Sequence, residues 1–403
     1  MMNYLISAYS VNPYKGSEDS IGWNWVLQYE KNYKKGDRII LLTKKFNEKD
    51  TRKGLKEFNI QHVELVIVDV PNALNWFREK HSAFHHMYYI LWQHWAWLWV
   101  KHSGIHFDVI HHVTMNDYRI PSEMYKAKGA KVIWGPMGGA QVTPKPLKVY
   151  EKNQLVANFR EFVNRSCSWN PLYKIALRSY YKIYCINNET QKQISRIVGK
   201  DVPLMPELAL RDEYKNLPIQ KRKNDILKIV FVGRLIGKKG IAFLVDALSL
   251  MPTDMEWELL IFGDGDDRAL IERQIADSGI EENIKLMGNR PLNQIAEAYQ
   301  QADIFVLPSL RETSGNVLLE AMAYAVPIVA FDTSFCRLLK KVDCGIFVNT
   351  EQALDNIKAD YCKAIVTLEQ DKKLAKQMGL NGYKYVNSKL TWDEKYRIIV
   401  NDM

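Results

Sequence analysis

The sequence predicts an α/β protein made of two doubly wound, Rossmann-like domains that face a central cleft. The 403 residues exceed one ordinary hydrophobic core and suit two domains of roughly 150–200 residues each. Short apolar runs alternate with helical patterns along the chain, which is typical of parallel sheets built from βα units. A polar stretch near the middle interrupts this alternation, and the pattern then restarts.

The predicted domains follow from that break. Residues 1–208 are expected to form the first domain, 209–225 the linker and 226–385 the second domain. A helix in 386–403 is expected to pack back on the first domain. The linker is predicted because residues 211–225 carry eight charged side chains and a proline.

The expected strands are short runs rich in branched apolar residues. In the first domain they are 4–8, 38–42, 63–68, 109–112, 131–134, 183–186 and 202–205. In the second domain they are 227–232, 257–262, 284–287, 304–307, 326–330 and 345–348. The first helix of the second domain is predicted from apolar residues at helical spacing: Ile241, Leu244, Val245 and Leu248.

Composition excludes several classes of protein. Apolar residues make up 47% of the chain and charged residues 25%, so a disordered chain is excluded. Residues 1–210 hold 29 basic and 18 acidic side chains, a net charge of +11, whereas the remainder has a net charge of −2. Such uneven charge does not indicate a nucleic-acid partner. Five cysteines without a C-x-x-C pair fit a reduced cytoplasm.

No membrane-spanning segment is expected. The N-terminal residues lack the basic and apolar regions of a signal peptide. The uncharged, mostly apolar stretch 87–100 is shorter than the ~20 residues that cross a bilayer. Residues 76–101 combine aromatic side chains with histidine and lysine. They fit both an interface with an anionic membrane and a helix packed on its own sheet, so we expect a cytoplasmic protein, with peripheral contact to the inner face of the cell membrane as one alternative.

The stretch after the strand 304–307 predicts an anion site. A polar turn leads there into a helix that begins near Gly315 and Asn316, and a helix N-terminus presents unpaired N–H donors. Glu312 and Glu320 lie eight residues apart, and carboxylates accept strong hydrogen bonds from sugar hydroxyls. The alternative is a capped surface helix with two solvated glutamates.

A second stretch, FVGRLIGKKG, places three cations in a glycine-rich turn between a strand and a helix. They are Arg234, Lys238 and Lys239. Glycines allow a close approach to the backbone, and cations neutralise a diphosphate without a metal. The turn has neither the Walker spacing nor G-x-G-x-x-G, so it predicts neither a P-loop nor a dinucleotide site.

Taken in order, these motifs resemble a known family. FVGRL-x3-KG is followed by LLIFGDGDD, by IKLMGNRPLNQIAEAYQQADIFVLPS and by E-x7-E with LEAMA. This order resembles the retaining nucleotide-sugar glycosyltransferases of family 4, also called group 1, which have the GT-B fold. The resemblance covers about residues 227–348.

The resemblance implies roles for individual residues. Arg234 and Lys239 match the pair that holds the donor diphosphate. Glu312 matches the glutamate that contacts the donor sugar, and Glu320 the one that binds the ribose hydroxyls. Ser314, Gly315 and Asn316 match the start of the phosphate-binding helix. Asn289 and Arg290 match the place where the family's backbone meets the nucleobase. The departures from the family pattern concern sugar recognition rather than the fold: Thr313, Ser314, Ala325 and the loop 332–337.

The first half resembles the family more loosely. Gly16, in a loop after the first strand, matches a glycine loop near the donor phosphates. Family members carry a histidine near the transferred sugar, where this chain has Val113 preceded by His111 and His112. Adjacent strand residues point to opposite faces. We therefore expect His112 to open to the cleft and His111 to be structural, with the reverse as the alternative.

Together these features predict an enzyme. The resemblance implies a retaining, metal-independent transferase that moves a sugar from a nucleoside diphosphate sugar to a hydroxyl of a glycan or lipid-linked acceptor, in bacterial surface polysaccharide assembly. Its catalytic residues are predicted to be His112, Glu312, Arg234 and Lys239. No cofactor is expected. No metal site is expected, because no cysteine or carboxylate cluster accompanies the histidines. The alternatives are a nucleotide-sugar 2-epimerase and a catalytically inactive binding subunit.

Overall fold

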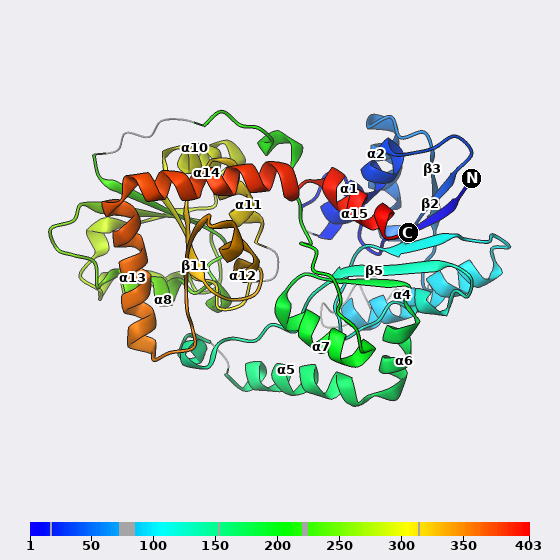
Figure 1. Cartoon of the computed structure of the whole chain (residues 1–403), viewed down its shortest axis with the longest axis horizontal. Helices are drawn as coiled ribbons and strands as arrows, with labels where there is room; N and C mark the ends of the chain where they lie inside the picture. Colours follow the sequence, from blue (N-terminus) through cyan, green and yellow to red (C-terminus); the bar gives the residue numbers. More distant parts are fainter. Residues whose placement is uncertain (17, 72–84, 152–153, 220–224, 313–314) are drawn as a thin grey trace. The chain divides into compact units, whose positions relative to one another are not determined.

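The computed structural model describes residues 1–16, 18–71, 85–151, 154–219, 225–312 and 315–403. The contacts divide it into two compact units. Unit 1 comprises Met1–Ala140, Asn164–Glu207 and Trp392–Met403, and unit 2 comprises Gln141–Val163 and Leu208–Thr391. Each unit is built on a six-stranded parallel sheet with helices around it (Figure 1).

The sheet of unit 1 has the order β3-β2-β1-β4-β5-β6. Its strands are β1 (Asn3–Ser7), β2 (Arg38–Thr43), β3 (Val63–Ile67), β4 (Val109–His112), β5 (Lys131–Met137) and β6 (Lys182–Cys185). Its helices include α1 (Glu18–Lys31), α2 (Glu48–Glu57), α4 (His85–His102), α6 (Pro171–Ser179), α7 (Asn188–Val198) and α15 (Trp392–Asn401). Helix α5 (Gln154–Ser166) begins in unit 2 and ends in unit 1.

The sheet of unit 2 has the order β12-β11-β10-β7-β8-β9. Its strands are β7 (Leu227–Val232), β8 (Trp257–Phe262), β9 (Ile284–Gly288), β10 (Ile304–Leu307), β11 (Ile328–Phe331) and β12 (Gly345–Val348). Its helices include α8 (Ile241–Leu248), α9 (Arg268–Ala276), α10 (Leu292–Gln301), α11 (Asn316–Ala323), α12 (Cys336–Leu339), α13 (Leu354–Gln370) and α14 (Lys372–Lys389).

Both sheets share one topology. Numbered within each unit, the strands lie in the order 3-2-1-4-5-6, which is that of a Rossmann fold. The prediction of two Rossmann-like domains is confirmed. In such sheets ligands bind beyond the carboxyl ends of the two central strands, where the strand order reverses. The fold therefore directs attention to the ends of β1 and β4 in unit 1 and of β7 and β10 in unit 2.

Several expected strands differ from the structure by one residue at an end, and β5 runs on to Met137. Two further differences lie beside a proline. Residues 202–205 form no strand, and Leu204 makes an isolated bridge to Cys185, because the neighbouring Pro203 has no N–H to donate. Strand β11 begins at Ile328 rather than at 326, since Pro327 cannot donate and Ala325 has a φ of +53°.

The domain boundaries also differ from the prediction, which ended the second domain at 385, whereas unit 2 runs on to Thr391. Residues 141–163, expected in the first domain, group with unit 2. The described part of the expected linker packs on unit 2 as well, where Tyr214 contacts the ring of Tyr324 and Asn216 bonds to Asn387. The polar composition that suggested a linker is therefore that of a chain segment lying on a domain surface.

Helix α4 packs on the sheet of unit 1. Tyr89, Trp92 and Ala96 are fully buried in its core cluster, and the indole of Trp92 donates to the Val68 carbonyl. Of the two alternatives for residues 76–101, α4 therefore shows a helix packed on its own sheet. The preceding residues 76–84 lie outside the described part. Within the described residues, no helix combines the length and apolar character needed to span a membrane.

Helix α15 lies against α1 within unit 1. The rings of Trp25 and Trp392 stand 5.6 Å apart, and those of Tyr29 and Tyr396 stand 5.4 Å apart. The end of the chain therefore completes the unit that the first residues begin.

Candidate functional site

The candidate site of unit 2 lies where the loops after β7 and β10 meet. The N–H of Leu310, after β10, donates to the Lys238 carbonyl, after β7, over 2.9 Å. Gly240 has a φ of +71°, and a Cβ there would lie 2.0 Å from the Pro308 carbonyl oxygen. Only glycine permits so close an approach of the two loops. Local backbone requirements thus bring the two predicted motifs together.

An ion pair joins these motifs. Lys239 donates to Glu312 over 2.6 Å, and both side chains are largely buried. Glu312 also accepts from the N–H of Gly315 over 3.2 Å. Burial opposes ionisation, but the charge of Lys239 and the hydrogen bonds from Ser309 and Gly315 lower the pKa of Glu312. The structure therefore holds an ionised carboxylate beside a cation at the predicted position.

Further cations surround this pair. Arg234 is exposed and, among the described residues, forms no ion pair. Burial, and then the positive charges of Lys239 and Arg234, lower the pKa of Lys238. Three cations close enough to perturb one another create an anion-attracting surface at the end of β7.

Helix α11 begins beside the ion pair. Gly315 is its N-terminal cap with a φ of +58°, and Asn316 is the exposed first residue. The unpaired N–H groups and positive dipole end of this helix add to the anion-attracting character. Thr313 and Ser314, the latter predicted to bind phosphate, lie outside the described residues.

Glu320, one turn before the end of α11, has two partners that the motifs did not indicate. Arg211 donates to it over 3.3 Å and the hydroxyl of Tyr299 over 3.2 Å. Burial raises the pKa of Glu320, against the opposing effects of Arg211 and Tyr299. Arg211 comes from the segment predicted to be a linker, so only the folded chain reveals this pairing.

Asn289 and Arg290 directly follow β9. Both are exposed, and the Nε of Arg290 donates to the Met287 carbonyl over 2.8 Å. Their place at the carboxyl edge of the same sheet is compatible with the predicted contact to a nucleobase, which stays a prediction.

In unit 1, Gly16 is exposed in the loop between β1 and α1, and a Cβ there would meet no atom within 4 Å. Two residues later, Glu18 accepts from the N–H of Met115 over 3.1 Å. Burial, reinforced by the charge of Glu207, raises the pKa of Glu18 to about 8. The sequence analysis assigned no role to this carboxyl group.

The paired histidines differ from the prediction. They point to opposite faces of β4, as expected, with His111 beside Tyr29 of α1 and His112 beside Tyr89 of α4. Both are fully buried, so the expectation that His112 opens to the cleft is wrong. Its two ring nitrogens lie 2.9 Å from the hydroxyls of Ser7 and Tyr89.

Burial also determines the charge of these histidines. It lowers the pKa of both His111 and His112 to about 3, so both rings are neutral at physiological pH. The apolar helices that cover both faces of a parallel sheet are the physical reason, because they leave no open face at the strand end. A contact between His112 and a donor sugar stays a prediction.

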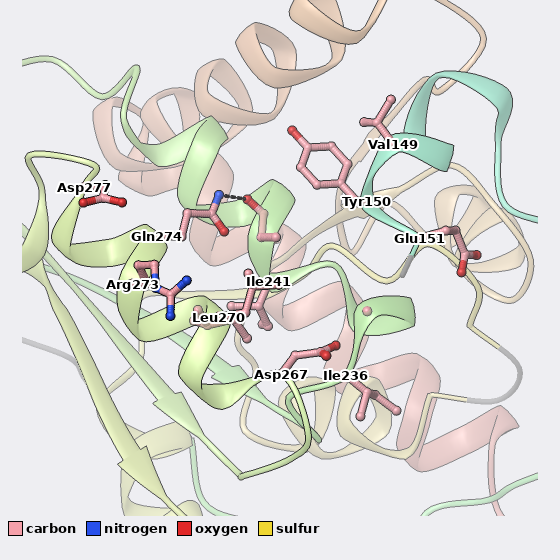
Figure 2. A pocket seen from close by; sticks show the side chains of 13 residues that line it. Val149, Tyr150, Glu151, Ile236, Ile241, Asp267, Leu270, Arg273, Gln274 and Asp277 are labelled. Atoms are coloured by element: carbon pink, nitrogen blue, oxygen red, sulfur yellow. Dashed lines mark hydrogen bonds between the residues drawn. The ribbon is translucent and has the colours of Figure 1, made fainter. Parts of the chain in front are cut away.

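Two neighbouring cavities lie in unit 2 beside the Gly237 turn. The larger, of about 450 Å³, is bounded by the segment carrying Val149 and Tyr150 and by the helix carrying Leu270 and Gln274 (Figure 2). The smaller, of about 300 Å³, is lined by Glu151, Val156, Ala157, Arg160, Gly237, Lys238 and Arg311. No sequence motif indicated either cavity, because their walls come from segments far apart in the chain.

Within the described residues, no cluster of three or more His, Cys, Asp or Glu side chains is suited to hold a metal ion.

The second half matches a known family. Residues 227–371 match the family described as Glycosyl transferases group 1. Over 134 residues the chain is 33% identical to "Amylovoran biosynthesis glycosyltransferase AmsK" of Erwinia amylovora, which covers 32% of this chain and 33% of that relative. The match thus spans about a third of the length of this curated relative.

Solved structures resemble the whole chain. The lipopolysaccharide outer core galactosyltransferase WaaB, in its apo form, has a TM-score of 0.64 at 17% identity over 100% of this chain and 99% of that one. Anabaena Alr3699/HepE in complex with UDP has a TM-score of 0.61 at 14% identity over 100% of both chains. These likenesses show that the two Rossmann-like units form a GT-B fold.

Proposed function

We propose that this protein is a glycosyltransferase that moves a sugar from a nucleoside diphosphate sugar to a hydroxyl of a glycan or lipid-linked acceptor. One observation carries the proposal. The Lys239–Glu312 pair, with Arg234 and Lys238 beside it, lies at the carboxyl ends of β7 and β10, inside the segment similar to group 1 glycosyltransferases. This edge is where a Rossmann-like sheet binds its ligand.

The proposed chemistry is electrostatic. As the bond between sugar and diphosphate breaks, negative charge accumulates on the leaving diphosphate. Arg234, Lys239 and the N-terminus of α11 stabilise that charge, because they are positive before the reaction begins and need no reorganisation. In the same proposal Glu312 contacts the donor sugar and Glu320 the ribose hydroxyls, while Asn289 and Arg290 lie near the base.

Retention of the anomeric configuration and independence of metal are finer parts of the proposal. The departing phosphate oxygen accepts the acceptor's proton during same-face attack, so the chain needs no dedicated base. The cations at the site supply the charge that a metal supplies in other transferases. Support comes from the resemblance to the retaining family and from the positive charges at the end of β7.

We also propose that the enzyme works in the cytoplasm, in surface polysaccharide assembly, at the inner face of the cell membrane. AmsK is named for amylovoran biosynthesis and WaaB for the lipopolysaccharide outer core, which supports this setting. Helix α5 offers a better membrane contact than α4. Its side chains Leu155, Phe159 and Phe162 recur at helical spacing and are 81%, 68% and 58% exposed.

Nucleotide binding tests the proposal first. UDP, GDP and ADP are compared by thermal shift, because a ligand that binds only the folded state raises the melting temperature. We expect one of them to stabilise the wild type and a matching sugar donor to be hydrolysed slowly without acceptor. Stabilisation without hydrolysis or transfer would instead indicate an inactive binding subunit, and release of a free 2-epimer would indicate an epimerase.

Three further measurements test the finer parts. The anomeric coupling constant of the product, by NMR, reports whether configuration is retained. Activity unchanged by EDTA supports metal independence. Sedimentation with anionic and neutral liposomes tests membrane contact. We expect Phe159→Ser to reduce sedimentation and Phe46→Ser, at an exposed aromatic residue of unit 1, to leave it unchanged.

A further inference from the structure

The smaller cavity of unit 2 is lined by three cations from separate parts of the chain. Arg160 comes from α5, Lys238 from the turn after β7 and Arg311 from the loop after β10. Lys238 and Arg311 directly precede Lys239 and Glu312. The dipeptides Lys238–Lys239 and Arg311–Glu312 therefore each contribute one residue to the cavity and one to the ion pair of the proposed donor site.

The cavity keeps an excess of positive charge. Its single lining carboxylate, Glu151, pairs with Arg311 over 3.2 Å and accepts a hydrogen bond from the hydroxyl of Thr143. Arg311 and Lys239 both contribute to lowering the pKa of Lys238, so the positive groups are close enough to act on one another. Such a cavity favours an anion, which relieves the repulsion among the cations.

An apolar surface adjoins these charges. Val156 lines the cavity and is itself 61% exposed. Leu155, Phe159 and Phe162 lie on the same helix and are more than half exposed. An amphiphile with an anionic head and a hydrocarbon chain matches this combination, whereas an acidic sugar offers nothing to the apolar residues.

We propose that this cavity binds a phosphate group of a lipid-linked acceptor, with the hydrocarbon chain against the apolar side chains of α5. The inference rests on the proposed transferase function and deepens it by naming the class of acceptor. Arg234 and Lys239 hold the donor diphosphate. The acceptor phosphate then occupies a neighbouring site, on the other side of the two dipeptides. Both sites are filled at once during transfer.

The experiment measures binding to the full chain with the donor site already filled. Wild-type protein is saturated with the nucleotide that stabilises it and is then titrated by calorimetry. The probes are farnesyl diphosphate, inorganic pyrophosphate, glucuronate and farnesol. We expect farnesyl diphosphate to bind most tightly, pyrophosphate more weakly, and glucuronate and farnesol weakest of all.

Variants assign the binding to the cavity. Arg160→Gln and Lys238→Gln are each expected to weaken the binding of both diphosphates about tenfold, as for loss of one charge-assisted hydrogen bond. Glu151→Gln is expected to strengthen it, because it removes the competing carboxylate and frees Arg311. Phe159→Ser should weaken farnesyl diphosphate alone. Arg165→Gln, at an exposed cation of the same helix outside the cavity, is the matched control.

Distinct outcomes overturn the two proposals. If no nucleotide binds and no donor is turned over, the proposed function fails. If a nucleotide binds but displaces pyrophosphate completely, the anion had occupied the donor site and the cavity proposal is wrong. If glucuronate binds as tightly as farnesyl diphosphate and Phe159→Ser has no effect, the cavity binds an acidic glycan rather than a lipid phosphate. Melting temperatures of all variants distinguish lost contacts from unfolding.

Discussion

The two sheets have the same strand order, yet their central strands end in opposite environments. In unit 2 the ends of β7 and β10 carry the ionised pair of Lys239 and Glu312 and additional cations. In unit 1 the corresponding strand β4 ends in two neutral, fully buried histidines. One topology thus supports a charged edge in one unit and an uncharged one in the other.

This difference separates what topology provides from what side chains provide. The strand order creates a position where loops diverge and a ligand has room. Whether a buried group keeps its charge there depends on a partner of opposite charge, which Glu312 has in Lys239 and which, among the described residues, the histidines of β4 lack. Glycines at the end of β7 let the two loops meet around a cation and a carboxylate, while aromatic residues of α1 and α4 enclose the histidines of β4. The predictions below test this separation, from the largest expected effect to the smallest.

The buried histidines of unit 1 should contribute mainly to the stability of the fold. His112→Ala removes a buried ring and leaves the hydroxyls of Ser7 and Tyr89 without it, which should cost about 2–4 kcal/mol of unfolding free energy. Urea denaturation checks this value, with exposed His102→Ala as control. Turnover lost at unchanged stability would show instead that unit 1 has a reactive edge like that of unit 2.

If charge rather than topology makes the site of unit 2, Lys239→Ala should weaken nucleotide binding by about 1.5–3 kcal/mol, roughly 10–150-fold. The variant removes a cation and leaves Glu312 without its partner. Calorimetric titration measures the effect, and Lys285→Ala, at an exposed ion pair of the same unit, is the control. Equal affinities for wild type and variant would place the nucleotide elsewhere.

The second glutamate should have a smaller effect. Glu320→Gln keeps a hydrogen-bond acceptor but loses its charge, so nucleotide affinity should fall about 5–10-fold, or roughly 1–1.4 kcal/mol. Exposed Glu297→Gln on α10 is the matched control. A full loss of affinity would mean that the pairing of Glu320 with Arg211 stabilises the structure of the site, and the melting temperature would then fall as well.

Two further effects, outside this order, are visible only as a dependence on pH. Burial raises the pKa of Glu18 to about 8, so the folded chain keeps a proton that the unfolded chain releases near pH 4.5. The stability from this group is complete below about pH 4.5 and is lost as pH rises through 8. Glu18→Gln should therefore flatten the fall in melting temperature between about pH 4.5 and 8, and exposed Glu64→Gln should not.

At acid pH the stability changes with pH in the opposite direction. The pKa values of His111 and His112 lie near 3 instead of 6.5, so stability should fall as pH drops from 6.5 towards 3. The double variant His111→Gln with His112→Gln should remove much of this acid sensitivity. An unchanged acid profile would mean that carboxylates elsewhere dominate it.

Much of the fold followed from local patterns. Strands β7, β8, β10 and β12 begin and end where the sequence predicted, because branched apolar runs bounded by turn residues have one buried arrangement. The cations and glutamates of the donor motifs were also named from the sequence, and the resemblance to a known family singled out Arg234, Lys239, Glu312 and Glu320 among them. The start of β11 moved because Pro327 intervened.

By itself, the sequence determined the class of fold and singled out Lys239 and Glu312 separately, since the fold class follows from the periodicity of apolar residues and each of these two residues lies in a local motif. Only the tertiary structure decided the rest. It enclosed both histidines, brought Arg211 to Glu320 and made Arg160 and Glu151 line a cavity with Lys238. Burial and long-range pairing are properties of the packed chain, because apolar neighbours from distant segments exclude water and so set which groups keep their charge.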